Sequence, residues 1–417
     1  MLTSFGYARY RWLWFSNLAG SAGRWAMVLV VSAQLLQVTH SSFWVGLGLF
    51  LTQGPVILLA PYSGVLADRF DRRTLNVMAA AAAAAVTGTF ALLTETRLLS
   101  LPAMLVLSLL FGLAFVFQMT LRSTLVPNLV PKDHLMNAVS LFQVGTQGAQ
   151  FLGPALATPL LATGGYGPAW TLCALLYAAS AGLALFVGEV RAAGRPREGR
   201  HRLRDSLVYL LARPLAWAAV IAVALHCSLT MAYQGMLPMF VSMDLGAGSG
   251  SYGELLVAIG LGAVVGSLAL ARLSQPRLRP ALFVGSLMGS GLCLSVMGSA
   301  PSVTVAVVSG FFVGATQAMF MSMTLALIQA SVDDEFRGRA TSFYQLITLT
   351  PMAVFGWGMG GLADVTEPRP LMVVSGLLFL VAMAGYALLS DSVRRLFTAA
   401  GWQPTPTFVN EFAEVPA

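Results

Sequence analysis

The stretch Gly64-Val65-Leu66-Ala67-Asp68-Arg69-Phe70-Asp71-Arg72-Arg73 places five charged residues between two long apolar runs. The runs cover residues 43–67 and 74–96. Each reaches the length of roughly 20 residues that a helix needs to cross a bilayer. A short charged linker between two such runs predicts a pair of membrane-crossing helices, with residues 68–73 on one side of the membrane.

The composition of the whole chain agrees with a membrane protein. Of 417 residues, 57% are hydrophobic and 10% are charged, and the mean hydropathy is +0.76. A soluble domain carries about 25% charged residues, so water cannot cover most of this surface. We expect lipid to face it instead.

Apolar runs of spanning length recur along the chain and predict an all-α fold of twelve transmembrane helices. A polar, arginine-rich segment separates six runs from the other six. We therefore predict a six-helix bundle over 1–190, a cytoplasmic basic linker over 191–213, a second six-helix bundle over 214–396 and a cytoplasmic tail over 397–417. The runs lie near 12–38, 43–67, 74–96, 101–126, 137–162, 168–190, 214–243, 252–273, 280–300, 303–331, 340–364 and 370–392.

The basic residues predict the orientation, because cytoplasmic loops carry an excess of Lys and Arg. All but three of the 24 basic residues fall on one side of the predicted membrane. Arg97 and Arg369 lie on the other side, and Arg24 lies inside a span. We expect a multi-pass protein of the bacterial inner membrane with both termini in the cytoplasm. The net charge of +7 is then a topology signal, and nucleic acid is not an expected partner.

An internal repeat appears when the chain is shifted by 202 residues. The shift aligns Gly64-Val-Leu66-Ala67 with Gly266-Ser-Leu268-Ala269. It also pairs Gly112 with Gly314, Ser140 with Ser342, Gln143 with Gln345, and Asp133 with Glu335. Because each half has an even number of spans, both halves have the same orientation in the membrane. The sequence predicts a parallel repeat of two six-helix halves.

The loop over 64–73 resembles the signature G-x-x-x-D-R-x-x-R-R of the major facilitator superfamily, at the same place after the second span. The resemblance implies a twelve-helix transporter with a cytoplasmic gate centred on Asp68. The gate residues it implies are Gly64, Asp68, Arg69, Arg72 and Arg73. The alternative is a solvated loop that only fixes topology.

Shorter stretches are similar to the enterobactin-exporter branch of drug and siderophore exporters. They are Thr39-His40-Ser41-Ser42, Val45-Gly46-Leu47, Leu160-Leu161-Ala162-Thr163-Gly164-Gly165 and Arg337-Gly338-Arg339. A segment from Gly148 to Gly153-Pro154 is similar to the antiporter signature G-x-x-x-G-P, but it has one extra residue before the Gly-Pro pair.

The resemblance implies that spans 1, 4, 7 and 10 line a central cavity. Helical spacing places polar and aromatic residues on one face of each of these spans. The candidate substrate-binding residues are Asn17, Ser21, Arg24, Phe115, Gln118, His226, Thr230, Gln317 and Phe320.

Arg24 and His226 occupy equivalent positions of the repeat near the middle of their spans. An ionisable residue inside a membrane is a functional hypothesis by default. We expect Arg24 to attract an anionic or electron-rich substrate, and His226 to contact substrate or carry protons. Alternatively, Arg24 reaches the interface or backbone carbonyls, and His226 bonds to a neighbouring helix. The candidates for proton coupling are Asp68, His226 and Glu254.

Other patterns predict no cofactor, no metal site and no enzyme. The G-x-G-x-x-G pattern over 356–361 lies in an apolar span and indicates helix packing. Cys173, Cys227 and Cys293 have no metal-ligand spacing, and no P-loop is present. We predict a monomeric exporter of a small amphipathic compound, a drug or siderophore, by alternating access and proton antiport. The alternatives are a lysophospholipid translocator, a solute uptake carrier, and a membrane receptor or scaffold.

Overall fold

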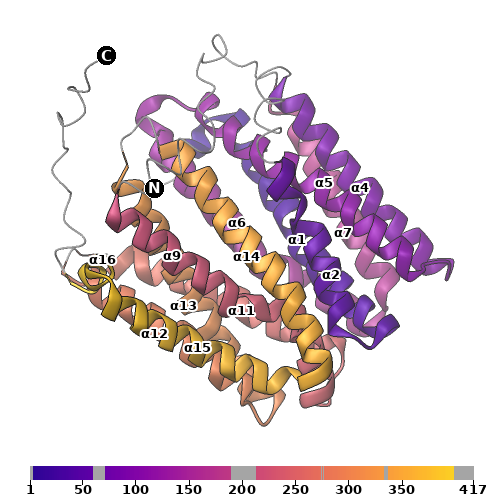
Figure 1. Cartoon of the computed structure of the whole chain (residues 1–417). Helices are drawn as coiled ribbons and strands as arrows, with labels where there is room; N and C mark the ends of the chain where they lie inside the picture. The colour runs from indigo at the N-terminus through magenta and orange to yellow at the C-terminus, as the bar shows by residue number, and fades with distance from the viewer. Residues whose placement is uncertain are drawn as a thin grey trace, which may run out of the picture.

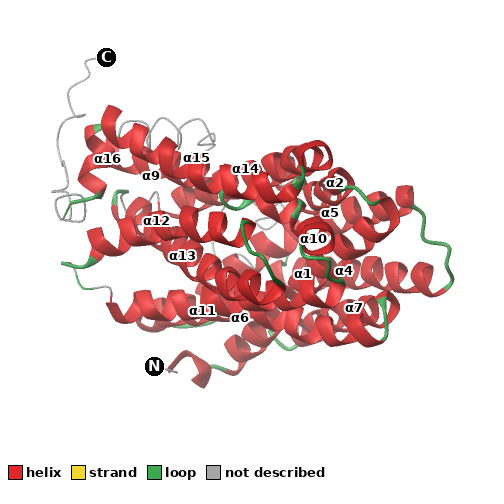
Figure 2. Cartoon of the chain, turned by 90° about the horizontal axis from the view of Figure 1, so that it is seen from below, coloured by secondary structure: helices red, strands yellow, loops and turns green. Residues whose placement is uncertain are grey.

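The computed structural model describes residues 3–59, 71–188, 213–273, 275, 277–332 and 337–398. In these ranges the chain forms helices joined by short loops, and no strand (Figure 2). The helices of the first half are η1 (Thr3–Gly6), α1 (Ala8–Thr39), α2 (Ser42–Gln53), α4 (Arg72–Glu95), α5 (Leu101–Leu125), α6 (Leu135–Thr163) and α7 (Tyr166–Leu185), with two 3-10 turns at Val126–Asn128 and Lys132–His134. The helices of the second half are α9 (Pro214–Leu229), η4 (Ala232–Gly235), α10 (Leu237–Met239), η5 (Phe240–Asp244), α11 (Ser249–Leu273), α12 (Arg279–Gly298), α13 (Val303–Ala330), α14 (Arg337–Thr366), α15 (Pro368–Leu389) and α16 (Asp391–Leu396).

The prediction of a polytopic all-α membrane fold is confirmed. Among the described residues, eleven helices are long and apolar enough to cross a membrane. The remaining long helix, α6, has 29 residues and carries Gln143, Gln147 and Gln150. With α6 included, six long helices precede residues 189–212 and six follow them, in agreement with the expected twelve.

The internal repeat is visible in how helices begin. Ser100 is the N-cap of α5, and its Oγ accepts a hydrogen bond from the backbone N–H of Ala103 at 3.4 Å. Ser302 caps α13 through the backbone N–H of Val305 with the same geometry. A serine at this position satisfies one of the free N–H groups of the first turn. The two caps are 202 residues apart, which is the offset found in the sequence.

The two halves form neighbouring bundles, one drawn in indigo to magenta and the other in red-orange to yellow (Figure 1). The helices alternate in direction, so the bundles have two common ends. We call the end that holds η1, the start of α4 and α16 the terminal end. The opposite end, which holds the α1–α2 and α14–α15 connections, is the far end.

Contacts between the halves gather toward the far end, where glycines let backbones approach closely. A Cβ added at Gly46 of α2 would lie 2.8 Å from the Cα of Trp357 in α14. A Cβ at Gly260 of α11 would lie 2.7 Å from the backbone of Phe151 in α6. The helix pairs α2–α14 and α6–α11 therefore form two seams between the halves.

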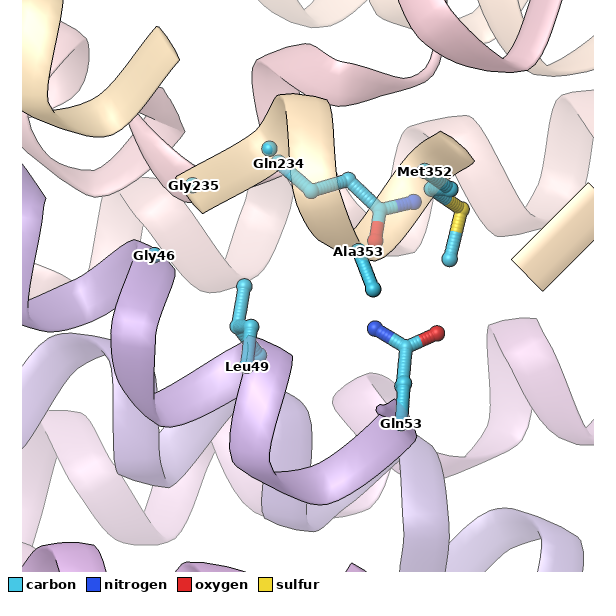
Figure 3. Close-up of a pocket in the computed structure, with 8 residues that line it drawn as sticks. Gly46, Leu49, Gln53, Gln234, Gly235, Met352 and Ala353 are labelled. Carbon is cyan, nitrogen blue, oxygen red and sulfur yellow. The ribbon is translucent and has the colours of Figure 1, made fainter. Parts of the chain in front are cut away.

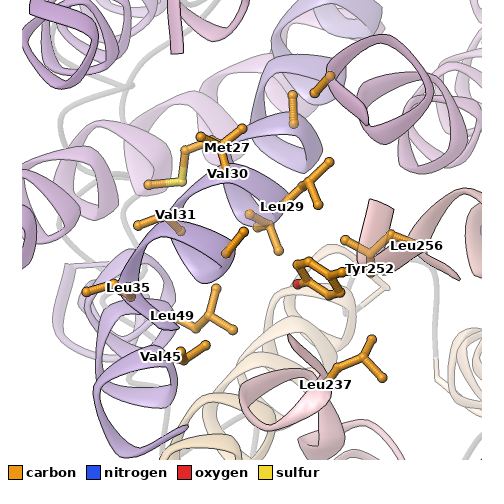
Figure 4. Packing of buried hydrophobic residues seen from close by; sticks show 14 of the residues in the cluster. Met27, Leu29, Val30, Val31, Leu35, Val45, Leu49, Leu237, Tyr252 and Leu256 are labelled. Atoms are coloured by element: carbon orange, nitrogen blue, oxygen red, sulfur yellow. The ribbon is translucent and has the colours of Figure 1, made fainter. Parts of the chain in front are cut away.

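The apolar cores show the same asymmetry between the ends. One cluster contains residues of both halves and joins Val30, Leu35 and Val45 to Leu237 and Tyr252 (Figure 4). A second cluster lies entirely in the second half, and a third, around Tyr10 and Phe142, lies entirely in the first. The halves thus share a core toward the far end and keep separate cores toward the terminal end.

Candidate functional site

Arg24 lies in the middle of α1 and contacts neutral groups of its own half. Its Nη2 donates to Gln53 Oε1 at 3.3 Å. The guanidinium carbon lies 4.3 Å above the ring centre of Phe115 and 5.4 Å from that of Trp25. Cation–π contacts of this kind are attractive, yet they leave the positive charge in place. No acidic side chain pairs with Arg24 in the described part of the chain.

Three further predicted residues of the first half form hydrogen bonds within that half. Asn17 Nδ2 donates to Thr146 Oγ1 of α6 at 2.9 Å, and Ser21 Oγ donates to Asn17 Oδ1 at 3.4 Å. Gln118 Oε1 accepts from Arg122 Nη2 at 2.6 Å. The structure thus brings Gln118 to Arg122, a residue that the sequence places at the cytoplasmic end of the fourth span. Arg122 is in fact only 6% exposed.

The predicted residues of the second half form one buried cluster. His226 is fully buried, and its Nε2 lies 2.8 Å from Ser290 Oγ of α12. Its ring stacks on Phe320 with ring centres 4.5 Å apart. Gln317 Nε2 donates to the backbone oxygen of Thr230 at 2.5 Å. The structure therefore gathers the candidates in two groups, each inside one half.

The predicted gate and proton-coupling residues are only partly described. Gly64, Asp68 and Arg69 lie outside the described residues. Arg73 Nη2 donates to the backbone oxygen of Leu185 at 2.7 Å, so it joins the start of α4 to the end of α7. Arg72 lies beside it in the first turn of α4. Glu254 is exposed near the start of α11.

A small cavity lies where α2 meets α14 and η4. It has a volume of about 10 Å³, which is room for roughly one water molecule. The side chains of Gln53 and Gln234 point toward it from opposite sides (Figure 3). Because Gln53 also bonds to Arg24, the arginine lies next to the seam between the halves. A larger recess of about 290 Å³ opens at the far end, lined in part by His40, Tyr166 and Ser249.

Sequence reasoning missed a carboxylate that joins the two halves. Asp364, near the end of α14, accepts a hydrogen bond from the backbone N–H of Ser42 at 2.6 Å. It also accepts from the backbone N–H of Phe43 at 3.1 Å and from Ser41 Oγ at 2.5 Å. Asp364 therefore caps the N-terminus of α2 from the opposite half. Its position at a helix end resembled an ordinary surface acid, and no spacing within the sequence connects it to residue 42.

Relatives of known function agree with the fold. Residues 2–403 match a family described as transmembrane secretion effector. The chain belongs to the transmembrane secretion effector family. It is 27% identical over 374 residues to the enterobactin exporter EntS of Citrobacter koseri, with 88% of each chain covered.

Solved transporters share the architecture of this secretion effector. A POT family transporter in complex with a thioalcohol-conjugated peptide superposes with a TM-score of 0.72 and 13% identity, covering 92% of this chain and 96% of that one. A bacterial homologue of the human lysosomal transporter Spinster, inward-facing and unoccupied, gives a TM-score of 0.68 and 16% identity, covering 95% and 98%.

The resemblance to the major facilitator superfamily and to its enterobactin-exporter branch is therefore confirmed. The protein is a multi-pass membrane transporter related to an enterobactin exporter. Within the described residues, no group of three or more His, Cys, Asp or Glu side chains is arranged to hold a metal ion.

Proposed function

We propose that the protein exports a small amphipathic compound, of the drug or siderophore class, by alternating access of its two halves. The environment of Arg24 carries the proposal. A guanidinium at membrane depth is costly, and here its contacts are an amide oxygen and aromatic rings. An anionic group on the substrate would offset that charge. The relation to enterobactin exporters supports export of a siderophore-like compound.

The separate cores fit one state of the proposed transport cycle. We place both termini in the cytoplasm of a bacterial cell, with the protein in the inner membrane, because Arg9, Arg11, Arg272 and Arg279 belong to the terminal end. The far end then faces outward, and it is the end where the halves share a core and Asp364 caps α2. A transporter closed outside and divided toward the cytoplasm is in the state in which an exporter loads its substrate and an importer releases it.

The proposed roles follow the two clusters. Asn17, Ser21, Arg24, Phe115 and Gln118 form the part of the substrate site in the first half. His226 and three further residues form the part of the substrate site in the second half. The three are Thr230, Gln317 and Phe320. Protons supply the energy by antiport, with Asp68, His226 and Glu254 as candidate carriers, and the loop from Gly64 to Arg73 forms the cytoplasmic gate. The protein works as a monomer in the bilayer, without a cofactor.

Transport into everted membrane vesicles tests this function. An imposed gradient, acid inside, should drive uptake of the anionic catechol 2,3-dihydroxybenzoate by the native protein. Arg24→Gln should reduce this uptake at least about tenfold, the loss expected for a hydrogen bond to a charged group. Arg97→Gln is the matched control, because it removes an exposed arginine at the far end.

The competing outcomes are distinct. Gradient-driven uptake of tetraphenylphosphonium that Arg24→Gln leaves unchanged would contradict the anion site and favour a general drug exporter. Movement of the catechol out of the vesicles would contradict export and favour a solute uptake carrier.

A further inference from the structure

A second arginine is buried beside Arg24 in the first half. Arg122 of α5 packs its guanidinium onto α1 at Gly20, where an added Cβ would lie 2.0 Å from Nη2. The same nitrogen donates to Gln118 Oε1 at 2.6 Å and to Ser180 Oγ at 3.0 Å. The Nε of Arg122 and the Nε2 of Gln118 are buried and have no hydrogen-bond partner among the described residues. Two donor nitrogens are therefore left over at this position.

The two arginines lie along the same face of α1. Gly20, which receives Arg122, is one turn before Arg24, a rise of roughly 6 Å along the helix axis. Tyr177 of α7 lies against Gly23 between them, with a Cβ at Gly23 only 3.0 Å from its ring. In the described part of the chain neither guanidinium has a carboxylate partner. The first half thus holds two positive charges close together, one buried and one partly buried, without a counter-charge among the described residues.

Burying like charges without a partner is strongly unfavourable, so this arrangement calls for an explanation. The second half shows that the fold does not require it. At the repeat offset, Arg24, Gln118, Arg122 and Tyr177 correspond to His226, Phe320, Thr324 and Phe379. There the histidine ring packs between Phe320 and Phe379, with ring centres 4.5 and 5.4 Å away, and a hydroxyl replaces the second arginine. The same place in the fold is thus aromatic in one half and doubly basic in the other.

We infer that Arg24 and Arg122 together form a binding site for a ligand with two anionic groups. Arg24, which is partly exposed, meets the first group. Arg122 meets the second with its free Nε–H, and Gln118 supplies the neighbouring amide donor. A dianion brings the local charge to zero, whereas a monoanion leaves one buried guanidinium without a counter-ion. The inference rests on the proposed function only in assigning this ligand class to the transported compound.

Binding to the purified protein in detergent tests the site without transport. The probes are benzoate, with one carboxylate, and phthalate and terephthalate, with two, each measured by titration calorimetry. The native protein should bind at least one of the dianions about tenfold more tightly than benzoate, as expected for one more charge-assisted hydrogen bond. Arg122→Gln should remove this preference and leave benzoate binding through Arg24 nearly unchanged. Arg122→Lys should retain part of the preference, and Arg97→Gln all of it.

The ratio of dianion to benzoate affinity separates a binding role from a structural one. A structural role would lower Tm in Arg122→Gln but leave the ratio as in the native protein, and that result would overturn the inference. Equal affinities in the native protein would overturn it as well. If Arg122→Gln does not fold, Arg24→Gln tests the inference instead. A site formed by both arginines requires that Arg24→Gln also abolish the tighter binding of the dianion relative to benzoate. A protein that shows the preference but no proton-driven export would contradict the proposed function and leave this site standing.

Discussion

His226 shows at the scale of one residue how a buried polar group is held. Its Nε2 is bonded to Ser290, its ring lies between two phenylalanines, and its Nδ1 has no partner among the described residues. His226→Ala should destabilise the protein by about 2 kcal/mol or more, because it leaves a cavity and takes from Ser290 the shorter of its two side-chain hydrogen bonds. Ser290→Ala leaves no cavity of that size and removes the hydrogen bonds to His226 and Thr230, so it should cost about 1 kcal/mol.

Thermal unfolding of the purified variants checks the order of these two effects. An unchanged Tm for His226→Ala would mean that the cluster of His226, Ser290, Phe320 and Phe379 does not stabilise the second half. The experiment is independent of proton coupling, since it needs no substrate and no gradient.

The two arginines Arg24 and Arg122 show how far site residues could be predicted from the sequence. Arg24 could be identified as a candidate site residue from the sequence. A single arginine inside a long apolar run is either buried within the protein or extends its side chain to the membrane interface. Arg122 could be found only in part: helical spacing places it on the same face of its span as Gln118, but it lies near the end of that span, where arginines commonly mark topology. Its burial depends on Gly20, Gln118 and Ser180, which belong to three different helices. Only the packing of α1, α5 and α7 brings these groups together.

At the scale of elements, Asp364 links the end of α14 to the start of α2. A carboxylate at a helix N-terminus satisfies free N–H groups and interacts favourably with the helix dipole. Loss of a cap costs about 1 kcal/mol, which is about a fivefold change in an equilibrium. Asp364→Ala, which removes every acceptor oxygen of the cap, should therefore raise the open population of the far end about fivefold.

Cysteine labelling measures this shift. Leu237 is fully buried in the shared core, so Leu237→Cys in a background without Cys173, Cys227 and Cys293 reports opening. A maleimide that cannot cross the membrane should react with it faster when Asp364 is replaced. Equal labelling rates with and without the carboxylate would show that the cap does not hold the far end closed. Asp391→Ala is a suitable control, because Asp391 pairs with Arg394 on the exposed surface at the terminal end.

At the scale of the whole molecule, alternating access requires the two halves to separate at the far end. A Cβ at Gly250 of α11 would lie 3.6 Å from the Cβ of Ala162 in α6, which is a distance that a disulfide can bridge. The double variant Ala162→Cys and Gly250→Cys should cross-link on oxidation and stop transport. Reduction should restore it, and each single variant should transport normally. Transport that continues with complete cross-linking would rule out opening between α6 and α11.

The architecture was predicted far better than the contacts between its halves. Hydropathy, basic residues and the 202-residue offset were enough for two six-helix halves, since each is a local or periodic property of the chain. The seams were not predictable in the same way. Gly46 and Gly260 read as ordinary small residues until their neighbours Trp357 and Phe151 are known. Which end of the molecule is closed depends on such pairs. Under alternating access, one sequence has to allow two conformations, one closed at the far end and one closed at the terminal end.

Under the proposed alternating access, the shared core at the far end limits how fast the protein can work. Every turnover of that proposed cycle breaks this seal and forms it again, so each methyl group that the seal buries adds to the barrier for release. Glycine backbones and one charged cap join the halves beside this core, and these contacts re-form without repacking side chains. A more stable variant with a larger seal would thus be a slower pump, and selection for turnover would favour a seal of only moderate strength.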